Sequence, residues 1–164
     1  MRACVKLKGR WMYEIGDDLK GFMESGVAVL VGTGDAEGRP RIDYGWGPRV
    51  RPDRVTVDVF LDVARADRAL ANLRENSKIA MTVADPVSYR SVQVKGVYRE
   101  TRAVNDDDRA WVQQQREAFL TAASLVGDPP DTIRNMWMDG VVRIAFVVDR
   151  AFDQTPGPEA GKPL

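Results

Sequence analysis

The sequence predicts a mainly β protein of the α+β class, in which an antiparallel β-barrel carries helices on its outside. Six segments have the length and the apolar or alternating pattern of β-strands, and most are joined by connections of hairpin length. A parallel sheet needs a crossover helix between successive strands, and here the strand segments outnumber the helical ones. An antiparallel barrel therefore fits the order of the segments better than a doubly wound parallel sheet.

The expected strands follow from hydrophobic patterning. Residues 27–31 (VAVLV) form a wholly apolar run of strand length. Residues 55–61 (VTVDVFL) alternate strictly, which places the valines and Leu61 on one face and Phe60 on the other. The remaining expected strands span residues 41–46, 79–84, 92–98 and 141–148.

Four helices are expected from their capping signals and apolar spacing. They cover residues 17–26, 65–75, 105–127 and 131–138, and the third begins with the acidic, capped segment Asn-Asp-Asp-Asp. We expect one domain over residues 1–150, followed by a Pro/Gly-rich C-terminal arm over residues 151–164. The arm has no periodicity, so it is expected to be extended, disordered or laid on a partner subunit.

Composition excludes several classes of function. Basic and acidic residues balance at 24 each, which argues against a nucleic-acid partner. No apolar run is long enough to cross a bilayer, so no membrane partner is expected. Cys4 is the single cysteine and there is no histidine, which suits a cytoplasmic protein and excludes triad catalysis and histidine-containing zinc sites. Catalytic residues stay unknown, no metal site is expected, and chemistry is assigned to a bound cofactor or to the remaining polar side chains.

The glycine-rich segment 33–46 (TGDAEGRPRIDYGW) predicts a hairpin turn rather than a phosphate-binding loop. Its glycines lack the spacing of a dinucleotide fingerprint, and Gly38 is followed by Arg-Pro where a phosphate loop needs Lys-Ser or Lys-Thr. Pro40 also opposes a helix in this region. Residues 35–38 (DAEG) have the composition of a turn between two strands.

Polar and aromatic side chains around this hairpin leave two interpretations open. The arginines form either a solvated charged edge or a basic rim for an anionic ligand; they are Arg39, Arg41, Arg49 and Arg51. Tyr44 and Trp46 share one face of their strand, and either pack in the barrel or subunit interface or stack on a ligand ring.

Three segments in this order resemble the FMN-binding split barrels that are similar to pyridoxamine 5'-phosphate oxidase. They are GVAVLVGTGDAEGRPRIDYGW, VTVDVFLDVARADRALANLRENSKIAMTVAD and YRSVQVKGVY, and the resemblance covers roughly residues 19–102. It implies a six-stranded antiparallel split β-barrel with peripheral helices. It further implies a homodimer with flavin sites at the interface, a small-molecule substrate and a two-electron redox reaction.

The resemblance also implies site residues. A phosphate-binding segment of the oxidase falls on residues 60–68, which suggests that Phe60, Asp62, Arg65 and Arg68 contact the cofactor. A later segment falls on residues 90–93 and adds Ser91 to this set. Trp46 and Arg90 are expected near a substrate.

Two alternatives to an FMN-dependent oxidoreductase stay open. Asp43, Asp62 and Asp67 stand where the oxidase has uncharged or basic residues, and carboxylates repel a phosphate dianion. The first alternative is a split barrel that has lost FMN and binds another small ligand without turnover. The second is a reductase of the same fold that uses a deazaflavin.

Overall fold

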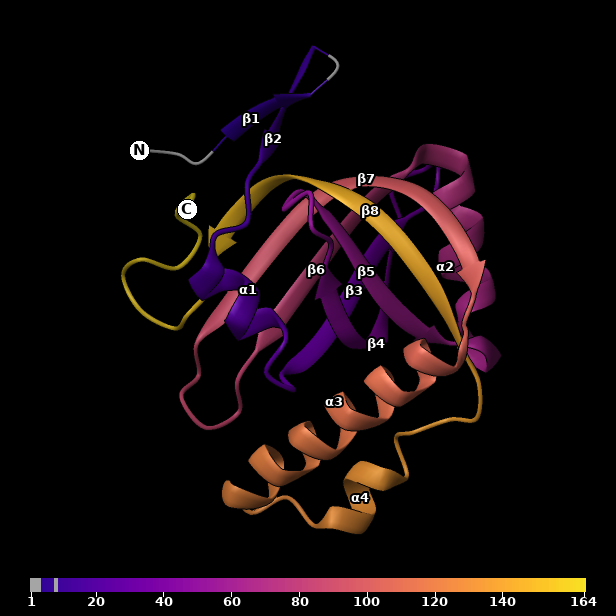
Figure 1. Ribbon diagram of the computed structural model, residues 1–164, viewed down its shortest axis with the longest axis vertical. Coiled ribbons are helices and arrows are strands. Elements are labelled where there is room, and N and C mark those ends of the chain that lie inside the picture. Colours follow the sequence, from indigo (N-terminus) through magenta and orange to yellow (C-terminus); the bar gives the residue numbers. More distant parts are fainter. Residues whose placement is uncertain (1–3, 8) are drawn as a thin grey trace.

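Six antiparallel strands close into a barrel in the order β3-β4-β5-β8-β7-β6 (Figure 1). The computed structural model describes residues 4–7 and 9–164. The strands of the barrel are β3 (Ala28–Gly34), β4 (Pro40–Val50), β5 (Thr56–Asp62), β6 (Lys78–Ala84), β7 (Ser91–Ala103) and β8 (Val141–Asp153). This architecture confirms the predicted fold class, and all six expected strands are present.

The barrel interior is filled by branched apolar side chains. Alternation along β5 places Val57, Val59 and Leu61 in the main core, whereas Phe60 packs in a second cluster outside the barrel wall. Both faces of β5 are buried because the second cluster is covered by a helix. The two-residue period of a strand thus separates the two cores.

Two helices close the ends of the barrel. Helix α1 (Asp17–Met23) contributes Leu19, Phe22 and Met23 to the main core, and α2 (Val63–Asn76) contributes Ala66, Ala69 and Leu73. Figure 1 shows α1 and α2 on opposite sides of the barrel. Each helix lays an apolar stripe over an opening, so the interior is sealed by the chain itself.

Helices α3 (Asp106–Leu125) and α4 (Pro130–Arg134) form a layer outside the barrel wall (Figure 1). Asn105 and Asp108 form a capping box at the start of α3, which confirms the predicted acidic helix start. The prediction that the next helix reaches residue 138 was wrong. Helix α4 ends at Arg134, and Met136 and Trp137 turn to pack on the second cluster.

Both ends of the chain add features that patterning did not predict. A hairpin of β1 (Cys4–Leu7) and β2 (Arg10–Tyr13) projects from the barrel (Figure 1). Strand β8 continues to Asp153, into the segment expected to be the arm, and the rest of the arm folds back on its own chain. There the amide of Leu164 donates to the carbonyl of Ala151 at 3.0 Å. Within the described residues, no helix is long and apolar enough to cross a membrane.

A substitution at Gly96 tests how closely β7 and β8 approach each other, at the point where the register of their pairing shifts. A Cβ at this position would overlap the carbonyl of Val147, whereas a Cβ at Gly32 would make ordinary contact with Ala80 at 3.7 Å. We expect Gly96→Ala to lower the free energy of unfolding by about 3 kcal/mol through overpacking. Gly32→Ala is the control and should change it by less than about 1 kcal/mol. Urea unfolding measures both, and equal effects would contradict the close approach.

Candidate functional site

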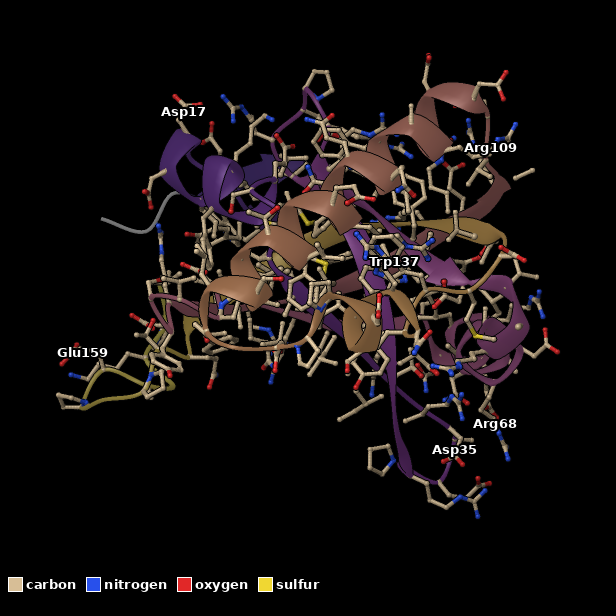
Figure 2. The ribbon with its side chains drawn as sticks, turned by 90° about the horizontal axis from the view of Figure 1, so that it is seen from below. Asp17, Asp35, Arg68, Arg109, Trp137 and Glu159 are labelled. Carbon is tan, nitrogen blue, oxygen red and sulfur yellow. The ribbon has the colours of Figure 1, made fainter. Side chains whose placement is uncertain are left out.

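A basic cavity of about 430 Å³ lies between the β3–β4 hairpin and helix α2. Its walls are formed by Asp35, Arg39, Pro40, Arg41, Ile42, Arg68 and Asn72. Figure 2 shows Arg68 and Asp35 on the same side of the molecule, at the end of this hairpin. The hairpin turn predicted at residues 35–38 is confirmed, since the amide of Gly38 donates to the carbonyl of Asp35 at 3.0 Å. The turn therefore brings Arg39, which precedes β4, and Arg41, which lies on β4, up to the helix.

Arg41 is held in place by two partner residues. Its guanidinium donates to both carboxylate oxygens of Asp43, at 2.8 and 2.7 Å, and to the carbonyl of Arg65 at 3.3 Å. The two bonds to Asp43 make a bidentate contact, and the carboxylate that accepts them is buried. Asp43, which stands where the oxidase has an arginine, thus orients Arg41 instead.

Arg68 differs from its neighbours in the cavity because it makes no hydrogen bond or ion pair with any residue that the structure describes. Arg39 is engaged by Asp35 at 2.7 Å and by Glu37 at 3.0 Å. Arg68 is exposed on α2 and reaches the cavity from the opposite wall. It is the cation of this cavity most available to an anion.

Asn72 is the polar anchor beneath these arginines. It is buried, and its Nδ2 donates to Oγ1 of Thr33 on β3 at 3.0 Å. One turn later Asn76 donates to the carbonyl of Gly34 at 2.6 Å. These bonds fix α2 against the hairpin and set the width of the cavity.

A second cavity, of about 520 Å³, adjoins the first, and Pro40, Arg41 and Ile42 line both. Its floor is made of small residues of β3, β6 and β7: Gly32, Gly34, Ala80 and Gly96. Its rim carries Lys78, Lys95 and Arg150. Together, the first cavity offers arginines for an anionic group and the second offers a surface of small residues.

Large apolar side chains lie exposed beside the second cavity. Ile42 is 66% exposed, Tyr44 46% and Leu30 40%. Leu30 pairs with Tyr44, and Gly32 with Ile42, so the three side chains form one patch on β3 and β4. Tyr44 therefore faces solvent in a single chain, whereas Trp46, two residues later, is covered by α3.

Trp46, Phe60 and Asp62 lie together, but under α3 and away from the basic cavity. Asp62 is 2% exposed and accepts bonds from Nε1 of Trp46, at 3.2 Å to each oxygen, and from Arg116 at 2.7 Å. Burial raises the pKa of Asp62, while the bonds from Trp46 and Arg116 oppose the rise. Direct contact of these three residues with a ligand stays a prediction.

Arg116 on α3 is the partner that sequence reasoning missed. Its guanidinium carbon lies 4.7 Å from the ring centre of Trp46 and 5.8 Å from that of Trp137. Burial lowers the pKa of Arg116. No local motif reveals this pair, because 54 residues separate the two side chains. The only signal in the sequence is an arginine on the helix face that also carries Val112 and Phe119.

Arg90 and Ser91 lie near α1, at the other end of the barrel. Arg90 stacks on Phe22 at 4.4 Å and pairs with Asp18. Ser91 opens β7 and holds the C-terminal segment, since the hydroxyl of Thr155 accepts from its amide at 3.1 Å. The structure does not bring these two residues to Arg65 and Arg68 within one chain, so their substrate and cofactor roles stay predictions.

The remaining arginines of the region lie in ion pairs with buried carboxylates, so they form neither a solvated edge nor a basic rim. Arg49 pairs with Asp108 and lies 5.8 Å from the ring centre of Phe60. Arg51 pairs with Asp58 at 2.7 Å and with Glu100 at 3.1 Å. Both sit at the end of β4 away from the basic cavity, so only Arg39 and Arg41 form a basic rim. The described residues contain no cluster of metal-ligating side chains.

Comparisons with known proteins identify the fold. No protein-family model and no curated protein matches the sequence. HupZ from Group A Streptococcus is similar with a TM-score of 0.54 and 20% identity, over 90% of this chain and 99% of HupZ. An F420 reductase gives 0.53 and 16%, over 84% and 98%. A putative pyridoxamine 5'-phosphate oxidase from Lactobacillus delbrueckii gives 0.52 and 14%, over 93% and 99%. The chain therefore has the split-barrel fold that the resemblance implied.

Arg116→Met tests the buried ion pair, because it removes the cation and leaves Asp62 buried. We expect the free energy of unfolding to fall by about 3–5 kcal/mol at neutral pH. The double variant Asp62→Asn/Arg116→Met, which removes both charges, should recover at least about half of this loss. Urea unfolding of the three proteins measures these differences, and a double variant as unstable as Arg116→Met would contradict the pairing.

The same variant should respond to pH in a defined direction. Without Arg116 the pKa of Asp62 in the folded state lies further above its ordinary value, so the folded state holds the proton more tightly than the unfolded state. The stability gained from that proton is present at low pH and is lost as pH rises through the folded-state pKa. The deficit of Arg116→Met should therefore be smaller at about pH 4.5 than at about pH 7.5.

Proposed function

We propose that this split-barrel protein binds a phosphate-bearing flavin, FMN or a deazaflavin, in the two adjoining cavities and uses it in a two-electron redox reaction of a small molecule. The observation that carries the proposal is Arg68. Its guanidinium lines the basic cavity opposite Arg39 and Arg41 and has no hydrogen-bonding or charged partner among the described residues. An unpaired cation facing two further arginines favours an anionic group between them.

The phosphate group is assigned to the basic cavity. Arg41 is already oriented by Asp43 and by the carbonyl of Arg65, so little side-chain freedom is lost when it binds an anion. Asp62 precedes α2 but its side chain does not cap the helix, because its oxygens are taken up by Trp46 and Arg116. The start of α2, with Arg65 in its first turn, thus adds favourable charge near the same cavity.

The ring system is assigned to the second cavity. Gly32 and Ala80 form a floor without large side chains, which lets a flat ring approach the strands closely. The volumes of about 430 and 520 Å³ each lie in the range of small-molecule sites. Ile42 borders both cavities and supplies apolar contact at the junction.

A second copy of the chain is proposed to cover this site. The patch of Leu30, Ile42 and Tyr44 borders the second cavity, and burying it in a homodimer removes exposed apolar surface from water. A partner subunit on this patch would also close the cavity on its open side. The homodimer thus accounts for both features with one interface.

The division of labour follows from the residues present. A bound flavin supplies the two-electron chemistry, and a chain without histidine is left with binding, orientation and electrostatics. Arg39, Arg41 and Arg68 hold the anionic end, and the small residues of β3 and β6 accept the ring. Fold similarity to an F420 reductase is the observation that keeps a deazaflavin beside FMN as the cofactor.

A binding protein without turnover is the second candidate. Asp35, Glu37 and Asp43 neutralise Arg39 and Arg41, which leaves Arg68 as the main free charge of the basic cavity. That balance suits a ligand with less negative charge than a phosphate dianion. The absorption spectrum of the purified protein separates the candidates, because only a flavin or deazaflavin gives visible or near-ultraviolet absorption with a matching fluorescence.

Arg68→Ala tests the phosphate assignment directly. We expect it to weaken FMN binding by about tenfold or more, since a charge-assisted bond contributes about 1.5–3 kcal/mol. Arg74→Ala is the matched control, because Arg74 is exposed on the same helix and does not line the cavity. Flavin fluorescence quenching measures the affinities, and circular dichroism checks that both variants fold. Equal affinities of the two variants would remove the assignment.

Ile42→Glu tests the homodimer. A carboxylate in the apolar patch should shift the protein from dimer to monomer, because a charge would have to be buried in the interface. Val87→Glu is the control, since Val87 is an exposed apolar residue in the turn between β6 and β7, outside the patch. Light scattering after gel filtration gives the mass of each protein. A wild-type monomer, or a dimer that survives Ile42→Glu, would overturn the proposed interface.

A further inference from the structure

The second cavity has a cationic rim to which the proposed cofactor site assigns no role. Five of its lining residues form one row across the outer face of the barrel, because each is the registered partner of the next. The row runs through Ile42, Gly32, Ala80, Lys95 and Arg150, on β4, β3, β6, β7 and β8 in that order. It faces outward, since Ile42 and Arg150 are exposed. The row is therefore apolar at β4, small in the middle and cationic at β7 and β8.

Lys95 and Arg150 are like charges placed directly opposite each other. The Cβ atoms of such a pair are typically about 4.5–5.5 Å apart, and like charges in this arrangement destabilise a sheet. Among the described residues that line the cavity, only Asp149 carries a carboxylate, and Arg150 donates to it at 3.2 Å. Lys95 has no carboxylate partner in the described part of the chain, and its ammonium lies 5.2 Å from the ring centre of Phe152. The pair thus keeps a net positive charge.

Lys78 brings a third cation to the same place from β6. It shares a strand face with Ala80, two residues later, and Val97 is its registered partner. Lys95, two residues before Val97, is thus its diagonal neighbour, and such neighbours are typically about 7–8 Å apart. Lys78 is exposed, and its ammonium makes no ion pair with a described residue. Two ammonium groups and a guanidinium therefore surround Ala80, whose methyl group leaves the space between them open.

We propose that Lys78, Lys95 and Arg150 form an oxyanion site that holds the carboxylate or phosphate group of the substrate. This inference rests on the proposed flavin site, because a ring lying on Gly32 and Ala80 would place a stacked substrate beside the three cations. The ammonium groups stand on four-carbon stems, which carry them above the floor toward a molecule on top of the ring. An anion there offsets the repulsion between Lys95 and Arg150. The substrate class is therefore a small molecule with an anionic end.

The oxyanion site and the proposed homodimer use different ends of the row. The apolar patch of Leu30, Ile42 and Tyr44 lies on β3 and β4, whereas the three cations lie on β6, β7 and β8. A substitution at one end is therefore expected to leave the other end in place, so the two proposals can be tested separately.

The experiment titrates the FMN-loaded full chain with benzoate, phenyl phosphate and benzamide, which share a ring and differ in charge. We expect both anions to shift the visible absorption band of the flavin saturably. The tighter anion should bind at least about tenfold more tightly than uncharged benzamide, and it identifies the group that the substrate carries. Benzamide binding as tightly as both anions would overturn the oxyanion site.

Lys95→Met removes the ammonium group and keeps most of the stem. Arg99→Met is the matched control, because it removes an exposed cation from the same strand, outside the cavity. Lys95→Met should weaken the tighter anion by about tenfold or more and Arg99→Met by less than about twofold, and both should bind FMN as the wild type does. Since Lys95 faces Arg150, Lys95→Met should not lower the urea midpoint of unfolding. Equal anion affinities of the two variants would overturn the proposal, and so would a lowered midpoint, which assigns Lys95 a structural role.

Failure of the flavin proposal gives a different result from failure of this one. A chain that binds FMN but shows no anion-dependent shift would leave the proposed function standing and overturn the oxyanion site alone. A chain that takes up neither FMN nor a deazaflavin would overturn the proposed function, and calorimetry of the flavin-free chain with the same anions then tests the three cations. Saturable binding that Lys95→Met weakens and Arg99→Met does not would support the oxyanion site. Absence of binding up to about 10 mM would overturn it.

Discussion

The ion pair between Asp62 and Arg116 determines where three elements of the structure meet. Asp62 is the last residue of β5 and the residue before α2, and Arg116 lies in the middle of α3. A buried charge is tolerated only with a partner, so this contact ties α3 to the barrel wall at one point. The same contact keeps the carboxylate of Asp62 away from the start of α2. Asp62 thus directly precedes α2, the helix that carries Arg68, while its side chain contacts α3 in the layer outside the barrel.

Local patterning was sufficient for the barrel and insufficient for the layer outside it. The alternation along 55–61 predicts both faces of β5, and the capped start of α3 follows from Asn105 and Asp108, because each signal lies within a few residues. The predicted end of α4 was wrong, because Trp137 packs on residues that are distant in sequence and does not continue the helix. The N-terminal hairpin was not predicted, because its strands are only four residues each and an alternation of that length is a weak signal. Contacts between residues distant in sequence determine the structure of these segments, and hydrophobic periodicity carries no information about such contacts.

The candidate site was predictable to the extent that it depends on one segment. The family resemblance pointed to Arg68, which the structure places in a basic cavity, and the hairpin turn explains why Arg39 and Arg41 reach the same place. Arg90 and Ser91 came from a segment that begins at the other end of the barrel. A motif gives the position of a residue along its strand, whereas the barrel closure decides which residues become neighbours. Arg116 was missed for the same reason, since its role depends on a contact across the fold.

Both openings of the barrel are closed by helices of the same chain, and branched side chains fill the space between them. One consequence is that recognition and folding use different residues. The arginines around the hairpin can change without disturbing Val57, Val59 or Leu61, and changes among those core residues leave the charges outside the barrel in place. A scaffold organised in this way can exchange one ligand chemistry for another by substitutions on its surface. Adaptability of this kind is a property of the sealed interior, because no ligand has to compete with the core for space.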